Sequence, residues 1–461
     1  MKNAILLDFG STHTKVVVVS LKEEKILHTN CFASTVKTDA RVGLKQCLDS
    51  AKNVLSKKEF DDAIKLSSSS AAGGLRMAVI GLSEKLSITA GRNTAFGAGG
   101  KILFTISGKI SQEQLNKISD EKVEIILFCG GYENGNETIM LHNAKEIANS
   151  KLRIPIIYAG NSALVNRIRG LMEIGRKECF FADNIIPNVG RLNTKMAEDI
   201  VREVFLKRIV NMKGLDKVKE SLDNILMPTP SAVLSAGELL SKGTKNEKGI
   251  GELMIIDIGG ATTDIHSFIE QSTYKGARLS GAKEVFSKRT VESDLGVRES
   301  SGLMLNEIGV EKLSKICNED RCWIEKAIQN RVINNEYIPE NEREKILDEE
   351  LSIIAARISS RRHAGYLEHI HSSNCKLLQV GKNISGIKNI VGTGGPIIHN
   401  HNPKNVLSAV LKKERIDQDC LLPVDASMFL DEKYIMYSMG LLREINADIA
   451  LRIMKKTLTK L

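Results

Sequence analysis

A strand, a glycine turn and a second strand occur twice in this chain, and this duplication limits the possible folds more than any other feature. The first copy is AILLDFGSTHTKVVVVS at residues 4–20, and the second is MIIDIGGATTDIHS at residues 254–267. Each copy ends an apolar strand with an aspartate, followed by glycine and hydroxyl residues. Alone, either copy could be an ordinary hairpin with a glycine turn. Together they predict two related lobes that face one ligand.

The residue types in both copies suit phosphate and metal chemistry. Glycine lets backbone N–H groups approach phosphate oxygens without a Cβ in the way, and hydroxyl side chains add donors. Carboxylates such as Asp8, Asp257 and Asp264 can hold hydrated Mg²⁺.

The composition is that of an ordinary globular protein, with 42% hydrophobic and 26% charged residues. Only 4% of residues are aromatic, so base stacking along an aromatic strip is not expected. The net charge of +9 fits an anionic ligand, an acidic partner or a lysine-rich solvated surface. The sequence has no long apolar run, and its eight cysteines form no CxxC pair. We expect a soluble cytoplasmic protein with reduced thiols, and no nucleic-acid or membrane partner.

Strands and helices alternate over residues 101–174, which favours βαβ units. Residues 66–80 carry a serine run and two glycines, and could form a flexible linker or lead into a strand. The pattern predicts mainly helix over 193–226 and a helix of small residues over 230–241. The charged residues 289–298 could be a loop near the site or a solvated turn.

Toward the end of the chain, the pattern predicts an amphipathic helix over 351–370, a strand over 389–391 and a closing helix from 437 to 461. The strand opens the glycine turn at residues 392–396, which could lie against a base or a ribose, although glycine turns are common. The predicted boundaries are a first lobe at 1–243 with an insertion at roughly 66–160, a second lobe at 252–440 and a C-terminal helix at 441–461.

Several common site motifs are missing from the sequence. It contains no GxxxxGK[ST] and no strand-linked GxGxxG, so P-loop and dinucleotide folds are disfavoured. It also contains no GxSxG elbow, which makes nucleophilic hydrolysis a poor explanation.

The remaining motifs resemble those of the actin, Hsp70 and sugar-kinase superfold. Residues 8–12 resemble its first phosphate motif, 257–264 its second and 392–396 its adenosine motif. Residues 229–237 look like the first connecting helix, and Gly440 looks like part of the second. The resemblance implies an α/β, two-lobed, actin-like and ribonuclease H-like ATPase fold with an inserted segment in the first lobe.

A narrower resemblance rests on six segments, which are 8–12, SSSAAGGLRM at 68–77, AGN at 159–161, TVESDLGVR at 290–298, RRHAG at 361–365 and GTGGP at 392–396. With these segments, most of the chain resembles the MutL/GlmL family associated with adenosylcobalamin-dependent glutamate mutase. This family is unrelated to the mismatch-repair protein of similar name. The family is regarded as an ATP-using reactivating factor for the mutase, so the resemblance implies a chaperone-like interaction with such a partner.

The resemblance implies that ATP and Mg²⁺ bind in a cleft between the lobes. Asp8 and Asp257 would be the catalytic residues that position hydrated Mg²⁺, and Asp264 is a weaker candidate for the same metal shell. The nucleotide would contact Gly10, Ser11, Thr12, Gly259, Gly260, Thr262, Gly392, Thr393, Gly394, Gly395 and Pro396.

Two departures limit the comparison. The Hsp70-like branch carries a glutamate at the start of the first connecting helix, where this chain has Met227-Pro-Thr-Pro230. No general base can be assigned there, so hydrolysis would be slow or need a partner. Tyr132 and Glu133 stand where the family pattern has Thr-Asp.

The resulting hypothesis is an ATP-binding, ATP-hydrolysing, chaperone-like factor that reactivates a glutamate mutase-type enzyme by exchange of inactivated cofactor. Two alternatives stay open: a small-molecule kinase of the same superfold, and a nucleotide-dependent scaffold or filament protein.

Overall fold

The chain forms two compact units. The computed structural model describes residues 2–10, 13–36, 38–70, 75–210, 224–370 and 376–461. Unit 1 comprises Met1–Ala236, Ser280–Val285 and Tyr437–Ile453, and unit 2 comprises Gly237–Leu279, Phe286–Met436 and Met454–Leu461. Neither unit is one continuous stretch of sequence. The lobe boundaries given above stay a prediction.

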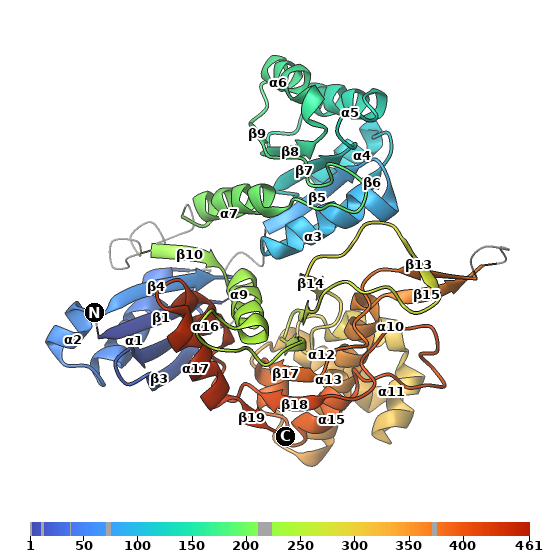
Figure 1. Ribbon diagram of the computed structural model, residues 1–461. Helices are drawn as coiled ribbons and strands as arrows, with labels where there is room; N and C mark the ends of the chain where they lie inside the picture. The colour runs from blue at the N-terminus through green and yellow to red at the C-terminus, as the bar shows by residue number, and fades with distance from the viewer. Residues whose placement is uncertain (1, 11–12, 37, 71–74, 211–223, 371–375) are drawn as a thin grey trace. The chain divides into compact units, whose positions relative to one another are not determined.

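Unit 1 contains a five-stranded sheet in the order β10-β4-β1-β2-β3 (Figure 1). Its strands are β1 (Asn3–Phe9), β2 (His13–Ser20), β3 (Lys25–Ala33), β4 (Ile64–Ser69) and β10 (Asn224–Pro228). Strands β1, β2 and β3 form an antiparallel meander, and β4 and β10 continue the sheet parallel to β1. Helices α1 (Ala40–Lys52) and α2 (Lys57–Asp61) connect β3 to β4. This is the ribonuclease H-like topology.

Unit 2 repeats this topology in the sheet β14-β12-β11-β17-β18-β19. Its strands are β11 (Leu253–Ile258), β12 (Thr263–Phe268), β14 (Ser287–Glu292), β17 (Asn389–Thr393), β18 (Ser427–Leu430) and β19 (Thr459–Lys460). Strands β11, β12 and β14 are antiparallel, while β17 and β18 run parallel to β11. Strands β13 (Ala277–Ser280), β15 (Tyr366–His369) and β16 (Leu377–Val380) form a smaller sheet. The two repeated sheets confirm the predicted α/β, actin-like ATPase fold.

Between β4 and β10 the chain builds a separate parallel sheet in the order β6-β5-β7-β8-β9. Its strands are β5 (Leu75–Gly81), β6 (Gly100–Ser107), β7 (Ile125–Gly130), β8 (Ile156–Gly160) and β9 (Cys179–Phe181). The sheet confirms the predicted βαβ units and the inserted segment. Its strand order is that of a doubly wound flavodoxin-like sheet.

Both faces of the inserted sheet are covered by helices (Figure 1). Val79 of β5 packs with the helices on one face, and Ile80 packs with those on the other. The first group is η1 (Glu84–Ile88, a π-helical turn), α3 (Thr89–Gly97) and α7 (Lys195–Val210). The second is α4 (Gln112–Asp120), α5 (Thr138–Asn149) and α6 (Val165–Ile174), which follows the short 3₁₀ turn η2 (Ser162–Leu164). Alternate residues of the strands therefore point into two different cores.

The remaining helices follow β10. They are α9 (Thr229–Lys242), α10 (Ser301–Ile308), α11 (Val310–Cys317), α12 (Arg321–Ile333), α13 (Glu342–His363), α14 (Gly395–Ile398), α15 (Pro403–Ser408), α16 (Met436–Arg443) and α17 (Ala447–Thr457). Across the ranges that the structure describes, none of the helices has the length and apolar character needed to cross a membrane.

Three predicted segments are corrected in part by the structure. The segment 193–226, predicted to be mainly helical, ends in strand β10, which hydrogen-bonds to β4. The segment 66–80 leads into a strand, β5, as one of its two interpretations predicted, but its start is no linker, because Leu66–Ser69 belong to β4. The segment 289–298 begins as strand β14, paired with β12. In each case pairing with a distant strand overrides a local pattern of polar or helix-forming residues.

Two predicted helices have different limits. Helix α13 begins at Glu342, where Asn341 caps it by accepting a hydrogen bond from the Glu344 N–H, and it ends at His363. The closing helix is two helices, because the side chain of Asn446 accepts a hydrogen bond from Ile449 N–H and starts α17. Asparagine favours helix starts, and apolar periodicity alone does not reveal this signal.

Close packing of α16 on α9 gives a stability prediction. A Cβ on Gly440 would lie 2.0 Å from the carbonyl oxygen of Ala232, whereas a Cβ on Gly170 of α6 would meet nothing within 4 Å. We expect Gly440→Ala to lower the free energy of unfolding by about 1–3 kcal/mol, because backbone must move. Gly170→Ala should raise it by up to about 1 kcal/mol through helix propensity. Urea unfolding tests both, and equal midpoints for the two variants would contradict the packing argument.

Candidate functional site

The first turn joins β1 to β2 and carries Asp8. Asp8 is buried at the end of β1, with 1% of its side chain exposed. The Gly10 N–H donates to the His13 carbonyl oxygen at 2.9 Å, and a Cβ on Gly10 would lie 2.5 Å from that oxygen. The turn therefore requires glycine at this position. Ser11 and Thr12 lie outside the described residues.

The carboxylate of Asp8 is bound by three side chains of unit 1. The Ser68 hydroxyl donates to it at 2.9 Å and the Thr229 hydroxyl at 2.5 Å. The Lys15 ammonium lies 3.5 Å away. A buried carboxylate needs such donors to offset its lost hydration. Sequence reasoning assigned no role to these three residues, although the serine run after a strand and the threonine opening the connecting helix were visible signals.

The second turn joins β11 to β12 with the same hydrogen bond. The Gly259 N–H donates to the Thr262 carbonyl oxygen at 2.9 Å, which matches the first turn. Asp257 ends β11 as Asp8 ends β1, and its side chain is half-buried. The two predicted phosphate turns thus have the same local geometry within their own units.

The glycine turn after β17 lies directly on Asp257. Strand register places Thr393 beside Asp257, and a Cβ on Gly394 would lie 2.6 Å from the Asp257 Oδ1. Gly394 has a φ of 91°, which also favours glycine. Thr393 donates its hydroxyl to the buried carboxylate of Asp431 at 3.1 Å. The predicted second phosphate turn and adenosine turn therefore meet in unit 2.

Other residues of the glycine turn after β17 have distinct surroundings. A Cβ on Gly392 would lie 2.9 Å from the side chains of Ile397 and Leu407, so packing requires this glycine. At Gly395 the nearest atom to a Cβ would be 4.0 Å away, so packing does not require it. Pro396 lies in the first turn of α14, where proline is well tolerated.

Asp264 lies directly opposite Asp257 across the β11–β12 ladder. Arg289 of β14, itself 4% exposed, contacts the Asp264 carboxylate at 2.6 Å. Thr262 also donates its hydroxyl to Asp264, at 3.3 Å. Lys15 holds the equivalent position opposite Asp8 in the first turn. Arg289 was missed as the partner of Asp264 because strand β14 was not predicted.

The end of α13 anchors three different segments of unit 2. Arg361 pairs with Asp417 at 2.6 Å, and Arg362 contacts both Glu292 and Asp294 at 2.8 Å. The next residue is the buried His363, whose ring nitrogens contact the hydroxyls of Thr290 at 2.9 Å and Ser267 at 2.7 Å. The RRHAG segment thus has a clear role in fixing β12 and β14.

The glycine turn at 130–136 belongs to the inserted sheet. Glu133 accepts hydrogen bonds from Ser162 and Asn184, and so ties together the loops that follow β7, β8 and β9. Desolvation pulls the pKa of Glu133 upward, but these hydrogen bonds outweigh it and hold the pKa below its usual value. Glu133 therefore has a structural task in the place where the family pattern has aspartate.

Sequence comparison places the chain in a known family. The family model described as MutL protein matches residues 4–458. The chain belongs to the MutL family. It is 36% identical to Protein MutL of Clostridium tetanomorphum over 458 residues, which is 99% of each chain.

Solved structures give only distant likenesses to this MutL-family chain. A gluconate kinase from Lactobacillus acidophilus is 10% identical with a TM-score of 0.33, covering 99% of this chain and 92% of the kinase. A xylulose kinase from Bifidobacterium adolescentis is 12% identical with a TM-score of 0.31, covering 100% and 95%. These scores carry no conclusion about activity.

The predicted site residues of this MutL-family chain fall into two described groups. Unit 1 holds Asp8 and Gly10, and unit 2 brings together the rest, which are Asp257, Gly259, Gly260, Thr262, Asp264, Gly392, Thr393, Gly394, Gly395 and Pro396. Among the residues that the structure describes, no three His, Cys, Asp or Glu side chains gather as a direct metal-binding group. Their roles with nucleotide and metal stay predictions.

Two buried histidines of unit 2, His266 of β12 and His363 at the end of α13, predict a pH dependence of stability. Burial holds the pKa of His266 and His363 well below the usual value, aided by Arg289 for the first and by Lys288 and Lys382 for the second. Both are neutral when folded, whereas the unfolded chain binds protons below its ordinary histidine pKa of about 6.5. Stability is therefore present above this pH and is lost as pH falls through it.

The test compares His363→Gln with His369→Gln, a change at an exposed histidine that contacts Asp419. Between about pH 6.5 and 5.5, the free energy of unfolding should fall equally in the wild-type protein and in His369→Gln. In His363→Gln the fall should be smaller than in the wild-type protein, by up to about 1.4 kcal/mol per pH unit. Urea unfolding at each pH measures this difference. If the free energy of unfolding changes equally with pH in all three proteins, His363 binds protons as readily in the folded protein as in the unfolded chain.

Proposed function

We propose that this protein is an ATP-binding and slowly ATP-hydrolysing factor that reactivates an adenosylcobalamin-dependent mutase of the glutamate mutase type. The observation that carries the nucleotide part is the repeated turn, with an aspartate at a strand end and the same 2.9 Å turn hydrogen bond in both units. The mutase part rests on membership of the MutL family over nearly the whole chain. We also propose that reactivation occurs by exchange of inactivated cofactor.

In this proposal both turns supply phosphate-binding groups. Backbone N–H groups around Gly10, Gly259 and Gly260 would bind phosphate oxygens, with the Thr262 hydroxyl as an additional donor. Ser11 and Thr12 are proposed to act in the same way on sequence alone. Gly395, whose Cβ position is open, would let adenosine approach the backbone closely, beside Gly394.

The strand-end aspartates fit a hydrated Mg²⁺. Asp8 is held in one orientation by Ser68 and Thr229, and Asp257 is confined by the close approach of Gly394. Mg²⁺ is bound through few carboxylates and several waters, so a dedicated protein cage is not needed. When bound with ATP it would neutralise phosphate charge. Asp264 stays the weaker ligand candidate, because Arg289 already neutralises it.

The residues around Asp8 favour slow hydrolysis. Thr229 stands at the start of α9, where the Hsp70-like branch has a glutamate, and its hydroxyl donates to Asp8. A hydroxyl in this role does not take a proton from water at neutral pH. We therefore propose that the nucleotide acts chiefly as a switch whose bound state alters affinity for the mutase.

Replacing the aspartate of the second turn tests the nucleotide part. Asp257→Asn keeps the side-chain size next to Gly394 but removes the charge, so Mg²⁺-dependent ATP turnover should fall by at least about tenfold. The matched control is Asp425→Asn, which alters an exposed aspartate of the same unit. Steady-state phosphate release and urea midpoints are measured together. Unchanged ATP turnover in Asp257→Asn would show that the nucleotide site does not include Asp257.

The mutase part is tested by recovery of an inactivated enzyme. A glutamate mutase-type enzyme carrying damaged cobalamin is mixed with fresh adenosylcobalamin, with or without this protein and ATP. Activity should return only with wild-type protein and ATP, while Asp257→Asn should give little recovery. Equal recovery in every mixture would refute the reactivation role but would leave ATP binding untouched.

A further inference from the structure

The backbone of the second turn is held by the loop that follows β14. The carbonyl oxygens of residues 259–261 all accept hydrogen bonds from this loop. Their donors are the N–H of Val297 at 3.2 Å, the N–H of Arg298 at 2.8 Å and the hydroxyl of Ser300 at 2.7 Å. The position of the turn therefore depends on the position of residues 297–300.

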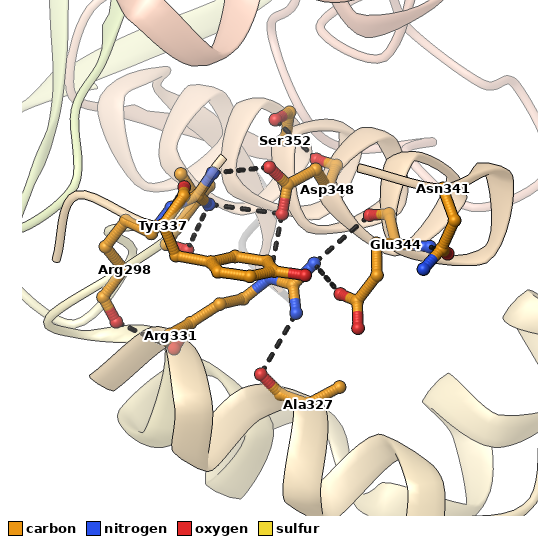
Figure 2. Close-up of polar contacts among 10 residues, drawn as sticks. Arg298, Ala327, Arg331, Tyr337, Asn341, Glu344, Asp348 and Ser352 are labelled. Atoms are coloured by element: carbon orange, nitrogen blue, oxygen red, sulfur yellow. Dashed lines mark hydrogen bonds and ion pairs between the residues drawn. The ribbon is translucent and has the colours of Figure 1, made fainter. Parts of the chain in front are cut away.

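Arg298 fixes this loop through its side chain (Figure 2). Its guanidinium donates to both carboxylate oxygens of Asp348 on α13, at 3.1 and 2.5 Å, and to the Tyr337 carbonyl oxygen at 3.0 Å. Only 12% of the arginine side chain is exposed. A two-pronged contact of this kind sets direction as well as distance.

Asp348 is itself held by a second arginine, as Figure 2 shows. Arg331 of α12 is fully buried and donates to Asp348 at 2.8 Å. Its guanidinium also pairs with Glu344 at 2.6 Å and lies over the Tyr337 ring at 5.2 Å. Two arginines and two carboxylates thus form a balanced cluster, and Asp348 keeps a cationic partner when Arg298 is removed.

The same helix holds the other end of the loop. Arg362, near the end of α13, contacts Glu292 and Asp294 at 2.8 Å. Asp348 on α13 contacts Arg298. Residues 292–298 are therefore bound to α13 at both ends, and the second turn follows the position of that helix.

We propose that Arg298 is a positioning residue that locks the Gly259–Gly260 turn to helix α13 in the geometry that binds ATP. The nucleotide part of this inference rests on the proposed function. The positioning part concerns the protein alone and can be measured without nucleotide.

The test compares three variants of the full chain. Arg298→Ala removes the contacts with Asp348 and Tyr337, while Arg298→Lys keeps the charge but lacks the planar fork. The control is Arg343→Ala, which also removes an arginine ion pair at α13, with Glu319, and an aromatic contact with Trp323. Glu319 and Trp323 belong neither to the loop 292–300 nor to the turn, so we take Arg343→Ala to report general damage to α13.

Hydrogen exchange of peptides spanning residues 254–263 and the Kd for ATP with Mg²⁺ are the two measurements. In Arg298→Ala we expect exchange at the turn to accelerate and the Kd to rise, each on the order of tenfold, with Arg298→Lys in between and Arg343→Ala unchanged. If Arg298→Ala does not fold, the same two measurements on Arg298→Lys test whether Arg298 holds the turn.

Two outcomes overturn the inference. One is turn exchange in Arg298→Ala that matches Arg343→Ala, and the other is faster exchange with an unchanged Kd. Failure of the wild-type protein to bind ATP overturns the proposed function instead, and exchange at the turn then decides alone whether Arg298 holds it.

Discussion

The carboxylate of Asp8 fixes the place where distant segments of unit 1 meet. Ser68 contacts it from the end of β4, Thr229 from the start of α9 and Lys15 from β2. Leaving a buried carboxylate without donors would cost several kcal/mol, so these contacts are a strong constraint on the sheet. The inserted segment begins after Ser69, the last residue of β4, and ends before Thr229, the first residue of α9. The residues that flank the insertion on both sides therefore hydrogen-bond to the same aspartate.

Unit 2 has the same strand arrangement around its aspartate, Asp257, but different side chains contact the residues there. Thr393 stands beside Asp257 as Ser68 stands beside Asp8, but its hydroxyl donates to Asp431. Opposite the aspartate, unit 1 has Lys15, whereas unit 2 has Asp264. Arg289 restores the charge balance there from the next strand. The fold thus repeats backbone geometry, while the side chains around each turn have diverged and give the two turns different electrostatic surroundings.

Local patterns made much of this structure predictable, because a strand, a glycine turn and a strand are specified by neighbouring residues. The two hairpins, the βαβ units and the helix of small residues at α9 follow from such patterns. Strand β10 does not, since its assignment depends on pairing with β4 far away in the sequence. The same holds for β14 and hence for Arg289. The contacts of Ser68 and Thr229 with Asp8, and of Arg289 with Asp264, join different segments of the chain, and no local spacing encodes them.

The second turn is held more firmly than a simple loop. A nucleotide can shift a protein between states only to the extent that its binding free energy differs between them. A freely mobile turn could adapt to the ligand in either state and would transmit little of that difference. Here, residues 297–300 engage the turn carbonyls, and the pair of Arg298 with Asp348 connects them to α13. A phosphate that displaces this turn would have to displace the helix as well, so the restraint on the turn is what would let slow hydrolysis serve as a switch in the proposed function.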